Sequence, residues 1–146
     1  MNGKAMDEAA SELLQLLLMD TDSDLAAIGE GDLASRKLRW IYVAGGTSVR
    51  TELIRQRMSL GLSGSALRSG RIIKLEGGLS DNDFFKLGEA IVLTEGLRAA
   101  AALPLQPPKE RALVIFIGRR RDESYSDAAL MRADEIGMLL SGWWDS

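Results

Sequence analysis

Hydrophobic positions near the start of the chain follow the period of a helix. Between residues 6 and 19, apolar side chains recur at steps of three and four residues, which predicts an amphipathic helix. Asp22 or Ser23 can cap a second short helix that ends near Ile28. The leucine-rich stripe of the first helix fits packing within the domain, and a dimer or partner surface is the alternative. Residues 1–30 are therefore expected to form an N-terminal helical segment.

Strand-like patterns dominate from residue 38 onward. These segments are rich in β-branched, aromatic or continuously apolar residues and are bounded by glycine, proline or charge. They are residues 38–44, 72–75, 91–94, 96–105 and 111–118. Residues 49–57 alternate imperfectly between apolar and polar types, so they either return as the second arm of a hairpin or form a helix.

Three more helices are predicted between and after these strands. One covers residues 65–69 and ends at Gly70, a residue type that favours the left-handed conformation of a helix C-cap. Another spans residues 81–87, with Asp81 as its N-cap, and the last begins at Ser124. Each of the three follows a short polar or glycine-containing segment, as expected for helices that connect strands.

The order of these elements predicts the fold class. Strands joined by hairpins and short helices indicate an α+β fold, with a central, largely antiparallel β-sheet flanked by helices on both faces. The chain has 146 residues, the length of one domain, and no repeat or long linker divides it. We therefore expect a single domain over residues 1–146.

Composition narrows the chemistry. The chain has no cysteine and no histidine, which removes thiolate nucleophiles, zinc–thiolate sites, the commonest general base and the usual haem ligand. Glu89 and Glu95 could act as paired acids, but at the two ends of one predicted strand they are expected to be solvated, as is the charged loop 119–123. We therefore expect no enzymatic activity, no metal and no cofactor.

Charge and hydropathy restrict the partners. A formal net charge of −3 argues against nucleic-acid binding, which needs a basic excess to neutralise phosphates. No apolar run is long enough to cross a membrane, and the start of the chain lacks the features of a signal peptide. A cytoplasmic protein without membrane or nucleic-acid binding is expected.

The sequence Gly61-Leu62-Ser63-Gly64 is the candidate binding feature, because it opens a predicted helix. A helix N-terminus presents unpaired backbone N–H groups and a partial positive charge, so it can hold a small anion without a cationic side chain. The two glycines allow close approach of a ligand, and the Ser63 hydroxyl adds a donor. The simpler alternative is a turn that only leads into the helix.

Two segments resemble GAF domains, a family of sensory domains. Residues 61–73 are similar to the family's glycine-bounded helix and the strand that follows it. Residues 111–127 and the apolar helix after them are similar to its last strand, turn and closing helix. Pro104-Leu105 matches the Pro-Leu of a further family strand. The resemblance implies a GAF core over residues 37–142.

Within the family, the chain resembles the stand-alone bacterial nitrate receptors of the NreA type. Members that carry linear tetrapyrroles or reduce methionine sulfoxide need cysteine, and haem-binding members need histidine, both of which are absent here. The resemblance implies nitrate or a similar small anion as ligand and a sensor histidine kinase of a two-component system as partner. A second copy of the chain, forming a homodimer, is a further candidate partner.

The resemblance also implies a ligand pocket made by one early strand, the start of the GAF helix and a later apolar segment. Its residues are Trp40, Gly61, Leu62, Ser63, Gly64, Ala90 and Val92. Ser63 stands where the family has alanine, and Ala90 where a larger aromatic residue is expected. Nitrate is planar, monovalent and weakly hydrated, so a flat Trp40 wall with two or three N–H donors would suit it. The alternative function is a GAF dimerisation or interaction module that binds another small ligand or none, with Trp40 as a core residue.

Overall fold

A six-stranded antiparallel sheet forms the centre of the molecule in the computed structural model, which describes residues 3–105 and 112–144. The strand order is β3-β2-β1-β6-β5-β4, and every neighbouring pair is antiparallel. The strands are β1 (Leu25–Asp32), β2 (Lys37–Ala44), β3 (Gln56–Arg57), β4 (Ile73–Lys74), β5 (Ala99–Pro104) and β6 (Ala112–Arg119). Arg111, the first residue of the predicted strand 111–118, lies outside the described residues.

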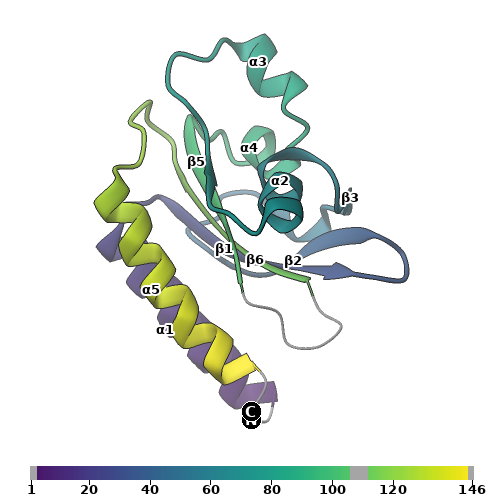
Figure 1. Ribbon diagram of the computed structural model, residues 1–146, viewed down its shortest axis with the longest axis vertical. Helices are drawn as coiled ribbons and strands as arrows, with labels where there is room; N and C mark the ends of the chain where they lie inside the picture. Colours follow the sequence, from purple (N-terminus) through teal and green to yellow (C-terminus); the bar gives the residue numbers. More distant parts are fainter. Residues whose placement is uncertain (1–2, 106–111, 145–146) are drawn as a thin grey trace.

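Helices cover both faces of this sheet, which confirms the predicted α+β architecture (Figure 1). The long helices α1 and α5 lie side by side on one face, and the three short helices lie on the other. The helices are α1 (Gly3–Asp20), α2 (Gly61–Ser69), α3 (Asp81–Lys86), α4 (Ala90–Thr94) and α5 (Asp127–Trp144), with a 3-10 turn, η1 (Thr51–Leu53).

Alternation along the central strands divides the core into two clusters. In β6, Leu113, Ile115 and Ile117 pack toward α1 and α5, whereas Val114 and Phe116 pack toward the short helices. Successive strand side chains point to opposite faces, so this continuously apolar strand supplies both clusters. The second cluster, on the side of α2 and α4, surrounds the candidate site.

Residues 22–28 are not the short helix that the capping pattern predicts. They lead into β1, which lies in the middle of the sheet and pairs with both β2 and β6. Its first four residues, 25–28, are completely buried. A strand buried on both faces shows no alternation of polar and apolar residues. The four apolar residues 25–28 are therefore as compatible with the end of a helix as with a strand.

Residues 91–94 also differ from prediction, because they form α4 rather than a strand. The Glu95 N–H donates to the Ile91 carbonyl at 3.0 Å, and Gly96 adopts a φ of +64° that ends the turn. Five residues are too short for a 3.6-residue period to separate from a continuous apolar run. This change moves Glu89 and Glu95 from the ends of a predicted strand to the two ends of a helix.

The ambiguous segment 49–57 contains both of the structures proposed for it. Residues 51–53 form the 3-10 turn η1, and β3 pairs with Lys37 and Leu38 of β2 as a hairpin arm would. Gly70 is the left-handed C-cap of α2, as predicted, but the two predicted N-caps are displaced. Ser80, not Asp81, caps α3, and Ser126, not Ser124, accepts a hydrogen bond from a backbone N–H in the first turn of α5.

Candidate functional site

The N-terminus of α2 holds a carboxylate from the same chain. The Ser63 N–H donates to Glu89 Oε1 at 2.8 Å, and both residues are completely buried. Gly61 has a φ of +69°, and a Cβ built on it would lie 2.8 Å from Glu89 Oε1. Glycine is therefore required here both by the backbone conformation and by the close approach of an anionic group.

Gln56 holds the second oxygen of the same carboxylate. Its Nε2 donates to Glu89 Oε2 at 2.7 Å, while its Oε1 accepts from the Ala90 N–H at 3.3 Å. A backbone N–H can only donate, so this contact fixes which way round the amide lies and turns its NH₂ group toward Glu89. Each Glu89 oxygen thus accepts a hydrogen bond from an uncharged donor.

The donors around Glu89 carry no charge. Burial raises the pKa of Glu89, and the hydrogen bonds from Ser63 and Gln56 only partly oppose that effect. No ion pair to Glu89 is found in the part of the chain that the structure describes. Among the described residues, the Glu89 carboxylate is therefore held by hydrogen bonds alone.

Three of the predicted pocket residues lie on the same face of the sheet as Glu89. Trp40, Leu62 and Val92 are buried in the same cluster, and the Trp40 ring meets Phe116 edge-on with centroids 5.5 Å apart. The Trp40 Nε1–H has no hydrogen-bond partner among the described residues. A buried indole N–H normally has one, so the missing partner marks Trp40 as a candidate ligand contact.

The remaining predicted residues have different roles. The Ser63 hydroxyl is buried and makes no hydrogen bond of normal geometry among the described residues, although it lies close enough to lower the pKa of Glu89. Ala90 is half-buried at the start of α4, and its N–H orients Gln56. A Cβ at Gly64 would overlap the Ser59 backbone, so packing within the chain requires that glycine.

Glu89 and Gln56 are the site residues that sequence reasoning missed. The prediction that Glu89 and Glu95 are solvated strand ends is wrong, because they are 0% and 3% exposed. The error follows from the strand assigned to residues 91–94, which would have placed both acids at exposed ends. The signal in the sequence was that Glu89 and Glu95 flank a short apolar segment that can also form a helical turn.

Glu95, at the opposite end of α4 from Glu89, is held in a second buried site. The Thr47 N–H and hydroxyl donate to its Oε1 at 2.8 and 3.0 Å, and the Ser48 N–H and Thr51 hydroxyl donate to its Oε2. Arg120 Nη2 adds an ion pair at 2.7 Å. Burial raises the pKa of Glu95, but the bonds from Thr51, Thr47 and Arg120 outweigh it and lower the pKa overall.

Arg119, the neighbour of Arg120, joins the sheet to both long helices. Its guanidinium donates to the carbonyls of Thr21 and Asp22 just after α1, and to those of Glu123 and Ser124 before α5, at 2.8–3.2 Å. It is 6% exposed, so the predicted solvated loop at 119–123 is wrong at its first residue. Arg119 fixes the junctions of α1 and α5 relative to β6.

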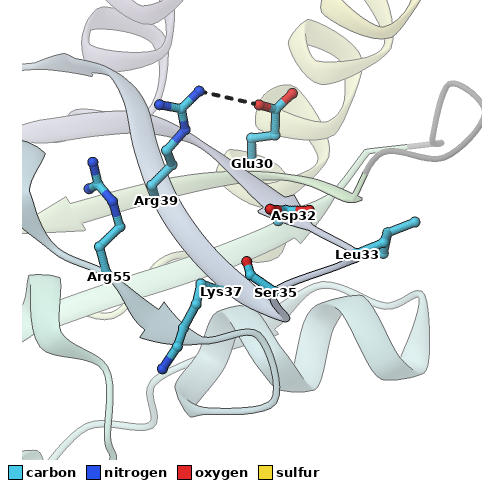
Figure 2. Close-up of a pocket in the computed structure, with 8 residues that line it drawn as sticks. Glu30, Asp32, Leu33, Ser35, Lys37, Arg39 and Arg55 are labelled. Atoms are coloured by element: carbon cyan, nitrogen blue, oxygen red, sulfur yellow. Dashed lines mark ion pairs between the residues drawn. The ribbon is translucent and has the colours of Figure 1, made fainter.

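A separate cleft of about 480 Å³ lies on the outer side of the β1–β2 hairpin (Figure 2). It carries Lys37, Arg39 and Arg55 together with two acids, and Arg39 pairs with Glu30 at 3.8 Å. Figure 2 shows the Lys37 ammonium pointing away from the Arg39 guanidinium, so these cations do not converge on one anion. This cleft is therefore a weaker candidate than the buried donors around Glu89.

The described residues form neither a metal site nor a membrane-spanning helix. No group of three or more acidic side chains in residues 3–105 and 112–144 is arranged to hold a metal ion. No helix in those residues is long and apolar enough to cross a membrane.

Comparison with known proteins gives structural matches. No family model matches the sequence, and no curated protein matches it. A structure of a Staphylococcus aureus NreA protein mutated in its nitrate-binding site is 25% identical, with a TM-score of 0.71 over 84% of this chain and 91% of that one. The GAF domain of a two-component sensor histidine kinase from Bacillus halodurans is 20% identical, with a TM-score of 0.69 over 93% and 90%.

An enzyme also shares this fold. A free methionine-R-sulfoxide reductase from Thermoplasma acidophilum is 15% identical, with a TM-score of 0.69 over 94% of this chain and 93% of that one. Fold alone therefore does not separate a sensor from an enzyme, and function has to be argued from the site.

Proposed function

The chain has the fold of GAF domains and resembles NreA, and from this premise we propose that it is a sensor for a small anion, nitrate foremost. In this proposal the anion binds at the N-terminus of α2, and the bound state modulates a sensor histidine kinase of a two-component system. The supporting observation is the Glu89 carboxylate on the Ser63 N–H.

A carboxylate and a nitrate ion have the same essential shape. Both are planar, carry one negative charge and spread it over oxygens about a trigonal centre. The donors around Glu89, one on Ser63 and one on Gln56, are therefore suitable for a nitrate oxygen. Trp40, whose indole N–H lacks a partner among the described residues, supplies a third donor and an aromatic wall within the same buried cluster.

No cation among the described residues contacts the Glu89 carboxylate at these donors, which supports a preference for weakly hydrated monoanions. Phosphate and sulfate lose more hydration energy on burial than nitrate does, and uncharged donors do not offset that loss. Leu62 and Val92 add apolar surface to the same cluster. Nitrate therefore fits the chemistry of this region better than a dianion does.

Helix α4 gives this site a physical connection to the long helices. Glu89 precedes α4 and Glu95 follows it, and Glu95 pairs with Arg120. The adjacent Arg119 holds the carbonyls that end α1 and precede α5. We infer that a ligand that displaces α4 shifts the α1–α5 pair through these contacts, which is a contiguous route of the kind that coupling requires.

The outer side of α5 is the surface proposed to contact the partner. Met131 and Met138 are 66% and 67% exposed, and their seven-residue spacing puts them on one side of the helix. Leu139 lies beside them and is 50% exposed. Exposed apolar side chains grouped on one helix suit a kinase helix or a second copy of this chain.

The proposal assigns no catalytic step to the chain and places it in the cytoplasm, without nucleic-acid or membrane binding. The chain has no cysteine or histidine, and Glu89 and Glu95 are both engaged in hydrogen bonds within the fold. The net charge of −3 agrees with a partner other than nucleic acid.

Thermal unfolding with matched sodium salts tests the proposal. Nitrate, nitrite, chloride, sulfate and phosphate are compared at constant ionic strength. A ligand at about a hundred times its Kd stabilises the folded state by about 2.7 kcal/mol, which raises Tm by several degrees for a domain of this size. A larger shift with nitrate than with chloride supports the sensor, and equal shifts with all salts contradict it.

The second candidate function is a GAF interaction module with another small ligand or none. One observation favours it: Glu89 already satisfies the Ser63 N–H, so the fold is complete at this point without an external anion. Under this function the outer side of α5, with Met131, Met138 and Leu139, binds the partner or a second copy of the chain. Equal salt shifts together with loss of self-association in Met138→Glu would favour this second function.

A further inference from the structure

We propose that Glu89 is an internal ligand of the site at the start of α2, and that an external anion binds there by displacing its carboxylate. This inference rests on the proposed function, since it concerns the same donors. It assigns to Glu89 the role of setting the affinity and the specificity of the site. The contacts that carry it are the hydrogen bonds of Glu89 to Ser63 and Gln56.

The donors at this site can serve only one oxyanion at a time. The Ser63 N–H has a single proton, and the Gln56 amide is fixed in orientation by the Ala90 N–H. Two negative charges held on the same uncharged donors would also repel each other strongly in a buried site. An external anion and the Glu89 carboxylate therefore exclude each other.

The Glu89 carboxylate is held weakly enough to be exchanged. Among the described residues its hydrogen bonds come from neutral groups alone, whereas Glu95 at the other end of α4 has four neutral donors and the Arg120 guanidinium. Hydrogen bonds between a carboxylate and neutral groups contribute less than those within a buried ion pair. Exchange at Glu89 therefore leaves the anchorage at Glu95 in place.

The backbone beside Glu89 also permits movement. Gly88 has a φ of +77°, and a Cβ on it would meet only the Leu60 side chain, at 3.9 Å. Helix α4 contains five residues, so few backbone hydrogen bonds resist a shift of its first turn. Displacement of Glu89 is thus a local change at the start of α4 and not an unfolding of the sheet.

The chemistry of the displaced group defines the ligand class. A ligand that replaces a carboxylate on one backbone N–H and one amide NH₂ is a small planar monoanion, such as nitrate or formate. Tetrahedral dianions do not match this planar arrangement and find no cation in contact with Glu89 among the described residues. The ligand has to outcompete an intramolecular group, which raises its apparent Kd in the native chain.

The test compares nitrate and formate binding to the full chain and three variants by calorimetry. Glu89→Ala removes the internal ligand, Glu89→Gln keeps its shape without the charge, and Glu76→Ala is a control at an exposed glutamate. Affinity for both anions is expected to rise by about tenfold or more in Glu89→Ala, because a hydrogen bond to a charged group contributes at least that factor. Glu76→Ala is expected to behave as the native chain.

The outcomes separate this inference from the proposed function. If the native chain binds no nitrate but Glu89→Ala does, the internal ligand is supported and the native chain is not a nitrate sensor. If both bind nitrate with equal affinity, the sensor stands and the internal ligand is wrong. If neither binds nitrate or formate, both are wrong.

A measurement on the native chain keeps the inference testable if Glu89→Ala does not fold. In protein labelled with ¹³C at the glutamate carboxyl groups, the Glu89 resonance is expected to shift during nitrate titration, while that of the exposed Glu76 stays in place. An unchanged Glu89 resonance during saturable nitrate binding would overturn the proposal.

Discussion

The two ends of α4 present the same residue type in opposite electrostatic settings. Glu89 and Glu95 are both buried, but within residues 3–105 and 112–144 Glu89 meets neutral donors alone, whereas Glu95 meets two threonine hydroxyls, two backbone N–H groups and Arg120. The pKa of Glu89 is raised by burial, and that of Glu95 is lowered because its hydrogen bonds exceed the effect of burial.

This difference separates a structural carboxylate from an exchangeable one. Burying a charge costs free energy unless it is paired, and Glu95 has the partners that offset this cost. Glu89 lacks a contacting cation among the described residues and carries that cost at neutral pH. Burial alone therefore does not identify a functional acid, and the set of donors around each acid does.

Glu95→Gln is expected to give the largest effect. It removes the charge that Arg120 and the 47–51 loop surround, so the free energy of unfolding should fall by about 2–4 kcal/mol. Urea unfolding measures the loss. Glu123→Gln weakens solvent-screened pairs with Arg121 and Arg119 and should cost much less. Equal losses in the two variants would contradict the structural role of Glu95.

Thr51→Val is a milder change at the same end of the helix. The variant keeps the branched shape of the buried side chain but removes the hydroxyl that donates to Glu95. The loss should be about 1–2 kcal/mol by urea unfolding, since one charged hydrogen bond is removed. A Thr51→Ser variant, which retains the hydroxyl, should recover most of this hydrogen-bond energy.

The two glutamates should also respond to pH with opposite signs. A raised folded-state pKa means that the contribution of Glu89 to stability falls as pH rises from its ordinary value of 4.5 to its raised value. A lowered folded-state pKa means that the contribution of Glu95 is complete above 4.5 and is lost as pH falls through its lowered value.

Unfolding free energies of the native chain, Glu89→Gln and Glu95→Gln between pH 3 and pH 8 check these signs. The native-minus-Glu89→Gln difference should fall with rising pH, and the native-minus-Glu95→Gln difference should rise, each by at most about 1.4 kcal/mol per pH unit. If both stability differences changed with pH in the same direction, Glu89 and Glu95 would not differ in the sign of their pKa shifts.

Ala90→Pro is expected to have the smallest effect, and it acts on Glu89 through Gln56. Ala90 is the first residue of α4, where proline is tolerated, but the variant lacks the N–H that fixes Gln56. Stability should fall by less than about 1 kcal/mol, and nitrate affinity should rise about twofold to fivefold as the hold on Glu89 weakens. Unchanged affinity by calorimetry would mean that Gln56 does not restrain the carboxylate.

The sequence allowed the fold to be predicted because its motifs occur in a fixed order. The end of α2 before Gly70, the apolar run of β6 and the closing helix were predicted close to their observed bounds, whereas α2 begins at Gly61 and not at Ser65. Hydrophobic periodicity and glycines at the ends of elements are local features of the sequence, so they can be interpreted without knowledge of the tertiary structure. Helices on both faces of an antiparallel sheet followed from this order.

The candidate site could be predicted only in part. Ser63 and the start of α2 were expected to present an anion-binding N–H, and the structure has a carboxylate on it. The source of that carboxylate, Glu89, could not be foreseen, because it lies 26 residues away in sequence and depends on α4 being a helix. Long-range contacts of one side chain leave no periodic signal.

In the proposed sensor, the N–H groups of Ser63 and Trp40 receive an external planar anion. Titration of the ¹⁵N-labelled native chain with sodium nitrate tests this, with the Ser63 amide and Trp40 indole resonances as the signals and sodium chloride at the same ionic strength as the control. Both signals are expected to shift with nitrate along one saturating curve and hardly to change with chloride. Signals that stay fixed, or that move equally with both salts, would contradict the proposal.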